Sequence, residues 1–325
     1  MFDRFKKKSN RFVVMDINEF LIKAVVLNTN QIENAVIYQS PLEDGIFDGD
    51  TLVDEMAFYE LMKELLEKWG LKRLDVRFFV PESTVMMKTF EHPDDIATEN
   101  LKGFVEMELG RSIHLPYSQP LLDVYDFKQG DGEATLFAAP SEEIIKVAGL
   151  LDDLSLHPSV AEIRALASIR FFEEVMNIES TKSYLIMEWS IAGVSISIYS
   201  GGKVEFLRYQ SIETERSKWI IETKDEEFIY EYTGDPEEYR GQLIDQIAEI
   251  DRILNFYRFS LYKGEKAVDE IIIFGDSPEM EYIYSEMVAN LVTPIQYFDD
   301  TKVKNKYTNF NSRDIPLIGL IYREV

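Results

Sequence analysis

The sequence predicts an α/β protein of two related halves around a shared cleft, with a small α+β unit inserted into the first half. Two similar segments, 12–27 and 184–199, carry this prediction. In each segment an apolar run of strand length meets a carboxylate, Asp16 or Glu188, and a second strand-like run returns after a short turn. A repeated strand–acid–turn–strand unit indicates that the two halves share one architecture.

The first half opens with strands, a crossover helix and a further strand, which is the order of an α/β domain. We expect the helix to begin at Thr51, which pairs with Asp54 as a cap, and to end at Gly70. The strands are expected at 11–27, 33–39 and 76–80.

The inserted unit spans residues 82–155 and has the order strand, helix, strand, strand, helix. Gly130-Asp131-Gly132 is expected to turn a hairpin between two of its strands, and Ser141 is expected to cap its last helix. The expected strands are 84–90, 121–127 and 133–138, and the expected helices are 96–109 and 141–154.

A helix expected at 160–177 returns the chain to the main body. In the second half we expect a hairpin turn at Gly201-Gly202, short strands and loops at 213–240, and a long helix at 241–262, where apolar residues recur in steps of four and three. After a buried strand at 270–274 and the turn Gly275-Asp276, we expect a helix to begin at Ser277 and Pro278, and a short apolar stretch follows at 315–321. The predicted domains are 1–81 with 156–180 for the first half, 82–155 for the inserted unit, and 181–325 for the second half.

The composition excludes several classes of function. Lys and Arg number 34 against 59 Asp and Glu, and a phosphate-backbone binder needs clustered basic residues, so we expect no nucleic-acid partner. The chain has no cysteine for disulfide or thiolate chemistry, and its 3 histidines are isolated from one another, so we expect no metal site. No apolar stretch approaches the ~20 residues of a membrane span, and we interpret the basic cluster at 4–8 as a solvated tail.

Several segments share their order and character with a known family. They are 14–17 with 23–24, 45–49, 80–81, 161–167, 249–258 and 315–320, and the Asn255-Phe256-Tyr257-Arg258 helix is among the more specific of them. In this order of segments the sequence resembles the PilM family of type IV pilus proteins, which lies in the actin-like ATPase superfamily and is related to the cell-division protein FtsA. The resemblance implies an actin-like ATPase fold, with the inserted unit where PilM and FtsA carry an extra subdomain.

The resemblance also implies a nucleotide cleft. The positions of this sequence that fall in that cleft are Asp16, Asn18, Lys23, Glu188, Gly193, Gly275 and Asp276. Asp16 and Lys23 match the family pattern, whereas Glu188 stands where the family has Asp and Asp276 where it has a second glycine. Actin-type phosphate loops need glycine and small residues so that backbone N–H groups can approach the phosphates. Here the loops at 18–20 and 189–191 carry larger side chains, and Glu19 adds negative charge. We therefore predict a degenerate site with no catalytic residue and no resident cofactor, and ATP with Mg²⁺ is the alternative.

Two functions follow from the resemblance. PilM-like proteins are scaffolds that bind the cytoplasmic N-terminal peptide of PilN, a bitopic inner-membrane protein, in a groove between the first subdomain and the inserted one. FtsA-like proteins are ATPases that form filaments. Because the phosphate loops are altered, we predict the scaffold, with Phe104, Glu106 and Glu108 as candidate peptide-binding residues. Acidic side chains there suit a basic juxtamembrane peptide.

We expect such a scaffold to be cytoplasmic and peripheral to the membrane through its partner. The sequence leaves open whether the protein forms a homo-oligomer, and whether its machine builds pili, secretes proteins or takes up DNA.

Overall fold

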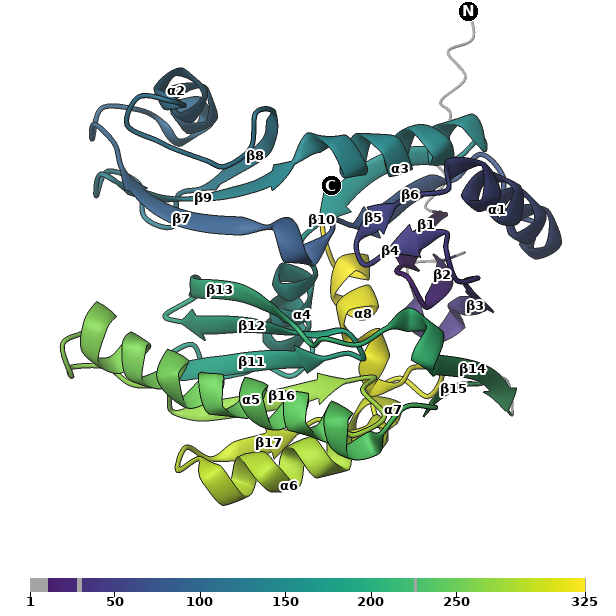
Figure 1. The fold of residues 1–325 in the computed structure, drawn as a ribbon. Coiled ribbons are helices and arrows are strands. Elements are labelled where there is room, and N and C mark those ends of the chain that lie inside the picture. The colour runs from purple at the N-terminus through teal and green to yellow at the C-terminus, as the bar shows by residue number, and fades with distance from the viewer. Residues whose placement is uncertain (1–10, 28–30, 225–226, 325) are drawn as a thin grey trace, which may run out of the picture.

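Two five-stranded sheets form the body of the protein (Figure 1). The computed structural model describes residues 11–27, 31–224 and 227–324, so the basic cluster at 4–8 lies outside the described residues. The first sheet has the order β10 (His157–Glu162), β6 (Asp75–Phe79), β1 (Phe12–Ile17), β2 (Leu21–Leu27) and β3 (Val36–Pro41). The second has the order β17 (Ile295–Tyr297), β16 (Glu270–Gly275), β11 (Ser183–Trp189), β12 (Gly193–Ser200) and β13 (Lys203–Ser211).

The two sheets repeat one pattern of strand directions. In the first, β1 pairs antiparallel with β2 and parallel with β6, and in the second, β11 pairs antiparallel with β12 and parallel with β16. Asp16 faces Lys23 across the β1–β2 pair, and Glu188 faces Ser195 at the corresponding place in the β11–β12 pair. The repeat predicted from the sequence is therefore confirmed.

Helices cover both faces of each sheet. Helix α5, which carries the apolar residues that recur in steps of four and three, packs with helix α6 on the outer face of the second sheet. Helices α1 and α3 pack on the outer face of the first. Helices α4 and α8 lie between the two sheets, at the centre of the molecule in Figure 1. These helices are α1 (Glu55–Trp69), α3 (Ser141–Asp153), α4 (Arg164–Glu174), α5 (Pro236–Asn255), α6 (Met280–Asn290) and α8 (Ile315–Ile321).

The strand β1 shows why this arrangement forms. Successive side chains of a strand point to opposite faces of its sheet. Val13 and Met15 belong to the outer core with α1 and α3, and Val14 belongs to the central core with α4 and α8. All three are fully buried, which is the reason for the continuous apolar run in the sequence.

The segment between β6 and β10 contains a small three-stranded sheet with a core of its own. Its strands are β7 (Met86–Glu91), β9 (Glu133–Pro140) and β8 (Pro120–Tyr125), in that order, and helix α2 (Leu101–Glu108) packs on them. Helix α3, which follows β9, packs Ile144 and Leu151 into the outer core of the first sheet, not into this small core. Figure 1 shows β7, β8, β9 and α2 projecting from the body.

Several expected boundaries are wrong. The first helix begins at Glu55, with Asp54 as its cap, because Thr51–Leu52 forms strand β5 with β4 (Phe47–Asp48). The expected helix at 160–177 begins at Arg164, since 157–162 is strand β10. The helix expected at Ser277 begins at Met280.

The second half also contains a separate hairpin and a π-helical turn. Residues 213–240, which show little periodicity in the sequence, contain the hairpin of β14 (Trp219–Lys224) and β15 (Glu227–Tyr232). The helix expected at 241–262 is α5 followed by a π-helical turn at Phe256–Leu261. The other described elements are α7 (Asp300–Lys304) and short 3₁₀ turns at Ile32–Asn34, Glu82–Thr84, Thr98–Asn100, Arg216–Lys218 and Ser312–Asp314.

The two central helices approach each other at Gly319. A Cβ atom at this position would lie 1.8 Å from the carbonyl oxygen of Ala167 in α4, so the backbones fit together only without a side chain. Both residues are buried in the inter-sheet core. The contact therefore fixes α8 against α4 and thereby the distance between the two sheets.

We expect Gly319→Ala to lower the free energy of unfolding by about 3 kcal/mol, because the added methyl group must push two buried backbones apart. Gly149→Ala on the exposed face of α3 is the matched control, since a Cβ there meets nothing within 4 Å. It should raise stability by up to ~1 kcal/mol through helix propensity. Urea unfolding of both variants tests this, and equal stability of the two would contradict the proposed close contact.

Candidate functional site

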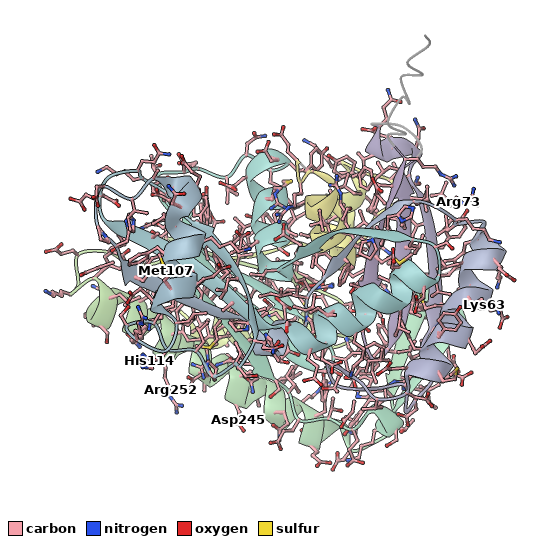
Figure 2. All side chains as sticks on the ribbon, turned by 90° about the horizontal axis from the view of Figure 1, so that it is seen from above. Lys63, Arg73, Met107, His114, Asp245 and Arg252 are labelled. Atoms are coloured by element: carbon pink, nitrogen blue, oxygen red, sulfur yellow. The ribbon has the colours of Figure 1, made fainter. Side chains whose placement is uncertain are left out.

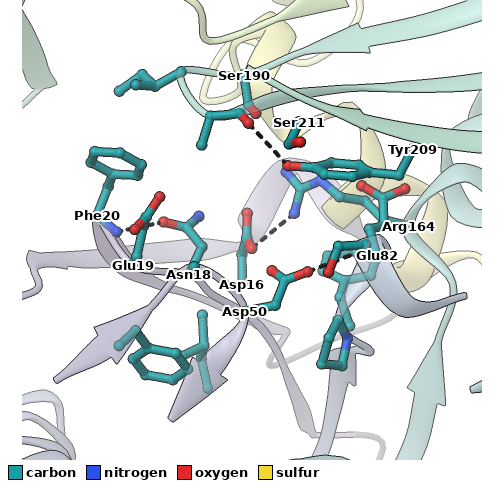
Figure 3. A pocket seen from close by; sticks show the side chains of 18 of the residues that line it. Asp16, Asn18, Glu19, Phe20, Asp50, Glu82, Arg164, Ser190, Tyr209 and Ser211 are labelled. Atoms are coloured by element: carbon teal, nitrogen blue, oxygen red, sulfur yellow. Dashed lines mark hydrogen bonds and ion pairs between the residues drawn. The ribbon is translucent and has the colours of Figure 1, made fainter. Parts of the chain in front are cut away.

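The carboxylates of Asp16 and Glu188 meet across the cleft through one arginine, Arg164. Figure 3 shows the pair of Asp16 with this arginine. Each carboxylate lies at the end of a central strand, Asp16 on β1 and Glu188 on β11. Arg164 Nη1 lies 2.8 Å from Asp16 Oδ1, and Arg164 Nε lies 2.8 Å from Glu188 Oε1. The guanidinium thus occupies the space between the two halves and joins them.

Arg164 is held in place by its position in the chain. It is the first residue of α4, two positions after the last residue of β10, and it lines the cleft. Its guanidinium also lies 5.0 Å from the ring centroid of Phe79. Burial opposes the positive charge of Arg164, but Asp16 and Glu188 outweigh it and raise the arginine pKa well above its usual value.

Two further carboxyl groups of the cleft are affected mainly by burial. Burial raises the pKa of Glu188 to about 8 and the pKa of Glu82 to about 7, although Arg164 lowers both. Ser195 Oγ donates a hydrogen bond of 2.5 Å to Glu82 Oε1. Burial also raises the pKa of Asp276. The cleft is therefore a poor environment for additional negative charge.

The first loop, between β1 and β2, satisfies its own backbone. Asn18 Oδ1 accepts hydrogen bonds from the backbone N–H groups of Phe20 at 2.9 Å and Leu21 at 3.1 Å. The Asn18 N–H in turn donates to the Leu21 carbonyl at 3.1 Å. This is an Asx-type turn, in which a side chain takes the N–H groups that a phosphate would need.

The two other loops of the cleft are also closed by internal contacts. Gly193 at the start of β12 lies under Tyr209, whose hydroxyl would be 2.1 Å from a Cβ at this position. Gly275 has φ 137°, and a Cβ there would lie 2.0 Å from the Trp189 carbonyl oxygen. The N–H groups of Asp276 and Ser277 both donate to that Trp189 oxygen, at 3.0 and 3.1 Å.

Lys23 lies apart from these loops. Its ammonium forms a buried ion pair with Asp314, at the start of α8. Lys23 is 5% exposed and Asp314 is 1% exposed, so the pair is shielded from solvent. The side chain therefore links β2 to the central helix α8.

The cleft itself is a cavity of about 660 Å³ between the two halves. Of the predicted cleft residues, Asp16, Asn18, Glu188 and Asp276 line it, whereas Lys23, Gly193 and Gly275 do not. Figure 3 shows Asn18, Glu19 and Phe20 on one side of the Asp16–Arg164 pair and Tyr209 near the arginine.

The hairpin β14–β15 contacts the first half near the cleft. Arg216, just before β14, donates to the backbone carbonyls of Glu19 at 3.2 Å and Leu42 at 3.1 Å. Tyr230 of β15 packs edge-on against Phe20, with ring centroids 6.2 Å apart. These contacts tie the second half to the loop after β1.

Sequence reasoning missed Arg164, Glu82 and Tyr209. The signal for Arg164 was a charge balance: two carboxylates predicted to share one cleft need a cation, and an arginine begins the apolar helix after residue 163. Glu82 and Tyr209 gave no such signal, because nothing local to their segments indicates which strand they face.

A second groove, of about 510 Å³, lies between the projecting small sheet and the body. Its wall is formed by β8 and β9 on one side and by α4 and the β12–β13 hairpin on the other. The predicted peptide-binding residues lie elsewhere on α2: Phe104 stacks on Phe90 with centroids 6.4 Å apart, Glu106 is exposed, and Glu108 accepts a bond from Ser112. None of these three lines the groove.

Comparison with known proteins identifies the relatives of this architecture. Residues 14–311 match the family described as type IV pilus assembly protein PilM. The chain belongs to the PilM family. No curated protein matches the sequence.

Solved structures agree with the family in fold. A structure described as a PilM–PilN type IV pilus biogenesis complex is similar with a TM-score of 0.74 at 15% identity, over 96% of this chain and 98% of that chain. A Bacteroides thetaiotaomicron protein with an actin-like ATPase fold and unknown function is similar with a TM-score of 0.55 at 8% identity, over 100% of both chains. The actin-like ATPase fold expected for a PilM protein is therefore confirmed.

Membrane-spanning helices must be both long and apolar. Among residues 11–27, 31–224 and 227–324, no helix has the length together with the apolar character that crossing a bilayer requires.

The buried carboxyl groups make stability depend on pH. Because Glu82 and Glu188 have folded pKa values of about 7 and about 8, above the ordinary 4.5, the native state binds more protons than the unfolded state between these limits. The contribution of these two groups to the free energy of unfolding is complete below pH 4.5, and it is lost as the pH rises through 7 to 8. We expect the unfolding free energy to fall over this range, as measured by urea unfolding at several pH values.

The double variant Glu82→Gln with Glu188→Gln should flatten that fall, since neutral amides carry no titration. Asp245→Asn, on the exposed side of α5, is the control and should keep the full slope. A double variant whose stability falls as steeply as that of the native sequence would show that other groups cause the effect.

Proposed function

We propose that this chain is a scaffold of type IV pilus assembly that holds the cytoplasmic N-terminal peptide of a PilN-like membrane protein and does not turn over nucleotide. The observation that carries the proposal is Arg164, whose guanidinium fills the space between Asp16 and Glu188. Membership of the PilM family and the likeness to a PilM–PilN complex support the role in pilus assembly.

The nucleotide site is degenerate in this proposal. An actin-type site binds phosphates through free backbone N–H groups. Here the N–H groups of Phe20 and Leu21 bond to Asn18, and those of Asp276 and Ser277 bond to Trp189. A triphosphate would have to break these bonds before it could form its own.

Charge supports the same conclusion. The carboxylates Asp16 and Glu188 are the groups that would face Mg²⁺ and phosphate, and both already pair with Arg164. Glu82 lies beside them, and burial already disfavours its ionisation. Adding the negative charge of a nucleotide to such a site costs free energy, because like charges in a cleft repel strongly.

The peptide site in this proposal is the groove beside β8. β8 is an edge strand of its sheet, pairing with β9 among the described strands. Leu121 and Tyr125 on β8 are 42% and 48% exposed, and the facing wall includes Leu166 and Ile169 of α4. An edge strand supplies backbone groups for an extended peptide, and the apolar side chains supply pockets for it.

The acidic helix α2 contributes at longer range. Glu106 and Glu108 lie on the projecting unit that carries β8, although they do not line the groove. We propose that they attract a basic juxtamembrane peptide before it docks, which affects the association rate more than the final contacts. Binding in this way would hold the protein at the membrane through its partner.

The nucleotide part of the proposal predicts that titrating ATP–Mg²⁺ into the protein gives no saturable heat below millimolar concentration. The reason is that both carboxylates and the loop N–H groups are already bonded. A micromolar dissociation constant, or nucleotide-dependent filaments in electron micrographs, would instead favour an active ATPase.

The peptide part predicts that Leu121→Ala weakens binding of a PilN-like N-terminal peptide by about tenfold, or ~1.4 kcal/mol, through faster dissociation. Glu106→Lys should slow association and reduce its salt dependence, and leave dissociation nearly unchanged. Met107→Ala, exposed on α2 and labelled in Figure 2, is the control and should bind as the native sequence does.

Surface-immobilised peptide and stopped-flow anisotropy measure the two rates separately. If Leu121→Ala binds normally while Glu106→Lys loses affinity through dissociation, the peptide docks on α2 and the groove beside β8 is not its site.

A further inference from the structure

The cleft between the halves has more carboxylates than its own cations neutralise. The acidic residues that line the cavity include Asp16, Glu19, Asp50, Glu82, Glu188 and Asp276. Arg164 and Arg216 are the cationic residues among the described residues of that lining. An excess of this kind raises the local concentration of cations.

The two arginines do not cancel this charge. Arg164 is engaged by Asp16 and Glu188 at 2.8 Å each. Arg216 donates to three backbone carbonyls, at 2.9, 3.1 and 3.2 Å, and its described hydrogen bonds reach no carboxylate. Glu19, Asp50 and Glu82 are therefore left without an ion pair to either arginine.

A second and independent observation concerns Glu188. This residue is 7% exposed and lines the cavity, and its Oε2 atom has no hydrogen-bond partner among the described residues. A buried carboxylate oxygen without a donor is costly, and a cation held beside the Glu188 carboxyl would offset part of that cost. Its other oxygen, Oε1, is the one that bonds Arg164.

The chemistry of the wall selects the kind of donor. The described residues contain no group of three or more His, Asp or Glu side chains arranged to hold a metal ion, so a compact dication lacks a cage. Phe20, Phe47 and Tyr209 line the same cavity and offer faces and edges to methylene groups. A flexible chain that carries several ammonium groups matches both features.

We propose that this cleft binds an alkylammonium ligand of the polyamine class, with one ammonium beside the Glu188 carboxyl and the others near Glu82 and Glu19. The cavity of about 660 Å³ lies within the range of small-molecule sites. Because the cleft and the peptide groove are separate cavities, a ligand of one can be absent while the ligand of the other binds.

The titration of the cleft supports a coupled uptake of the cation. Burial raises the pKa of Glu188 to about 8 and of Glu82 to about 7, and the groups that face them are Arg164, Asp16, Asp50 and Ser195. A bound ammonium favours the ionised carboxylate, so binding near pH 7 releases protons. Affinity therefore rises with pH between about 6 and 8.5, a range in which the amines themselves stay charged.

The test is calorimetric titration of spermidine into the full chain at pH 8 and physiological salt. We expect saturable binding at one site, affinity lower by about tenfold at pH 6, and heats that vary with the ionisation enthalpy of the buffer. Glu188→Gln and Glu82→Gln should each weaken binding by about tenfold, which corresponds to loss of one close charge contact.

Asp245→Asn is the matched control, because Asp245 is exposed on the outer face of α5, as Figure 2 shows, and should bind spermidine within twofold of the native sequence. Magnesium chloride of equal ionic strength serves as the second control. Binding that is reproduced by magnesium, or that both Gln variants leave unchanged, overturns the proposal.

A separate arm identifies the source of the ammonium group. N-acetyl-lysine methylamide presents one lysine side chain as a partner protein would. Saturation by spermidine alone supports a free polyamine as the ligand, and saturation by both probes with loss in Glu188→Gln supports a site that also accepts a lysine side chain. Binding of neither probe overturns the proposal, whatever the result with ATP.

Discussion

The ion pairs of Arg164 hold the two halves of this protein at one fixed separation. Asp16 belongs to the first sheet, Glu188 to the second, and both carboxylates depend on the same guanidinium. In a buried triad of this kind, removing one partner leaves an uncompensated charge that costs about 3–5 kcal/mol. The same arginine lowers the pKa values of Glu188 and Glu82, against the larger effect of burial, which raises them.

Helix α4 connects the cleft to the groove beside β8. Its first residue is Arg164, and residues further along it, Leu166, Ile169, Arg170 and Glu173, line the groove. Within the helix these groups move together, because it packs tightly against α8 on its other side. The groove is therefore lined by a helix whose first residue, Arg164, is anchored in the cleft by two ion pairs.

The sequence predicted the parts of the fold that depend on local pattern. The repeated strands are recognisable because both faces of each sheet are covered, which produces continuous apolar runs such as 12–15 and 184–187. The strand β10 was not recognised, because it alternates exposed and half-buried residues and joins directly to the start of α4. Helix α3 was grouped with the inserted unit by its place in the chain, whereas its buried side chains face the first half.

The site was less predictable than the fold for a related reason. Asp16 and Glu188 could be paired because each ends a similar strand, but the partner that completes them comes from a third segment. The contacts of Asn18 are local by contrast, since its side chain bonds the N–H groups two and three residues further along its own turn. Propensity and spacing describe neighbours along the chain, whereas the pairing of Arg164 with both carboxylates is made by tertiary structure.

The central position of α8 has a consequence for how the molecule forms in the cell. This helix comes from residues 315–321, yet it packs against α4 and completes the core between the two sheets. A ribosome has synthesised both sheets before that helix emerges, so the inter-sheet core cannot be completed until residues 315–321 have been made. Chains with such long-range closing contacts fold slowly. Until α8 is in place, the apolar side chains of α4 and of both sheets that this helix covers lack their packing partner.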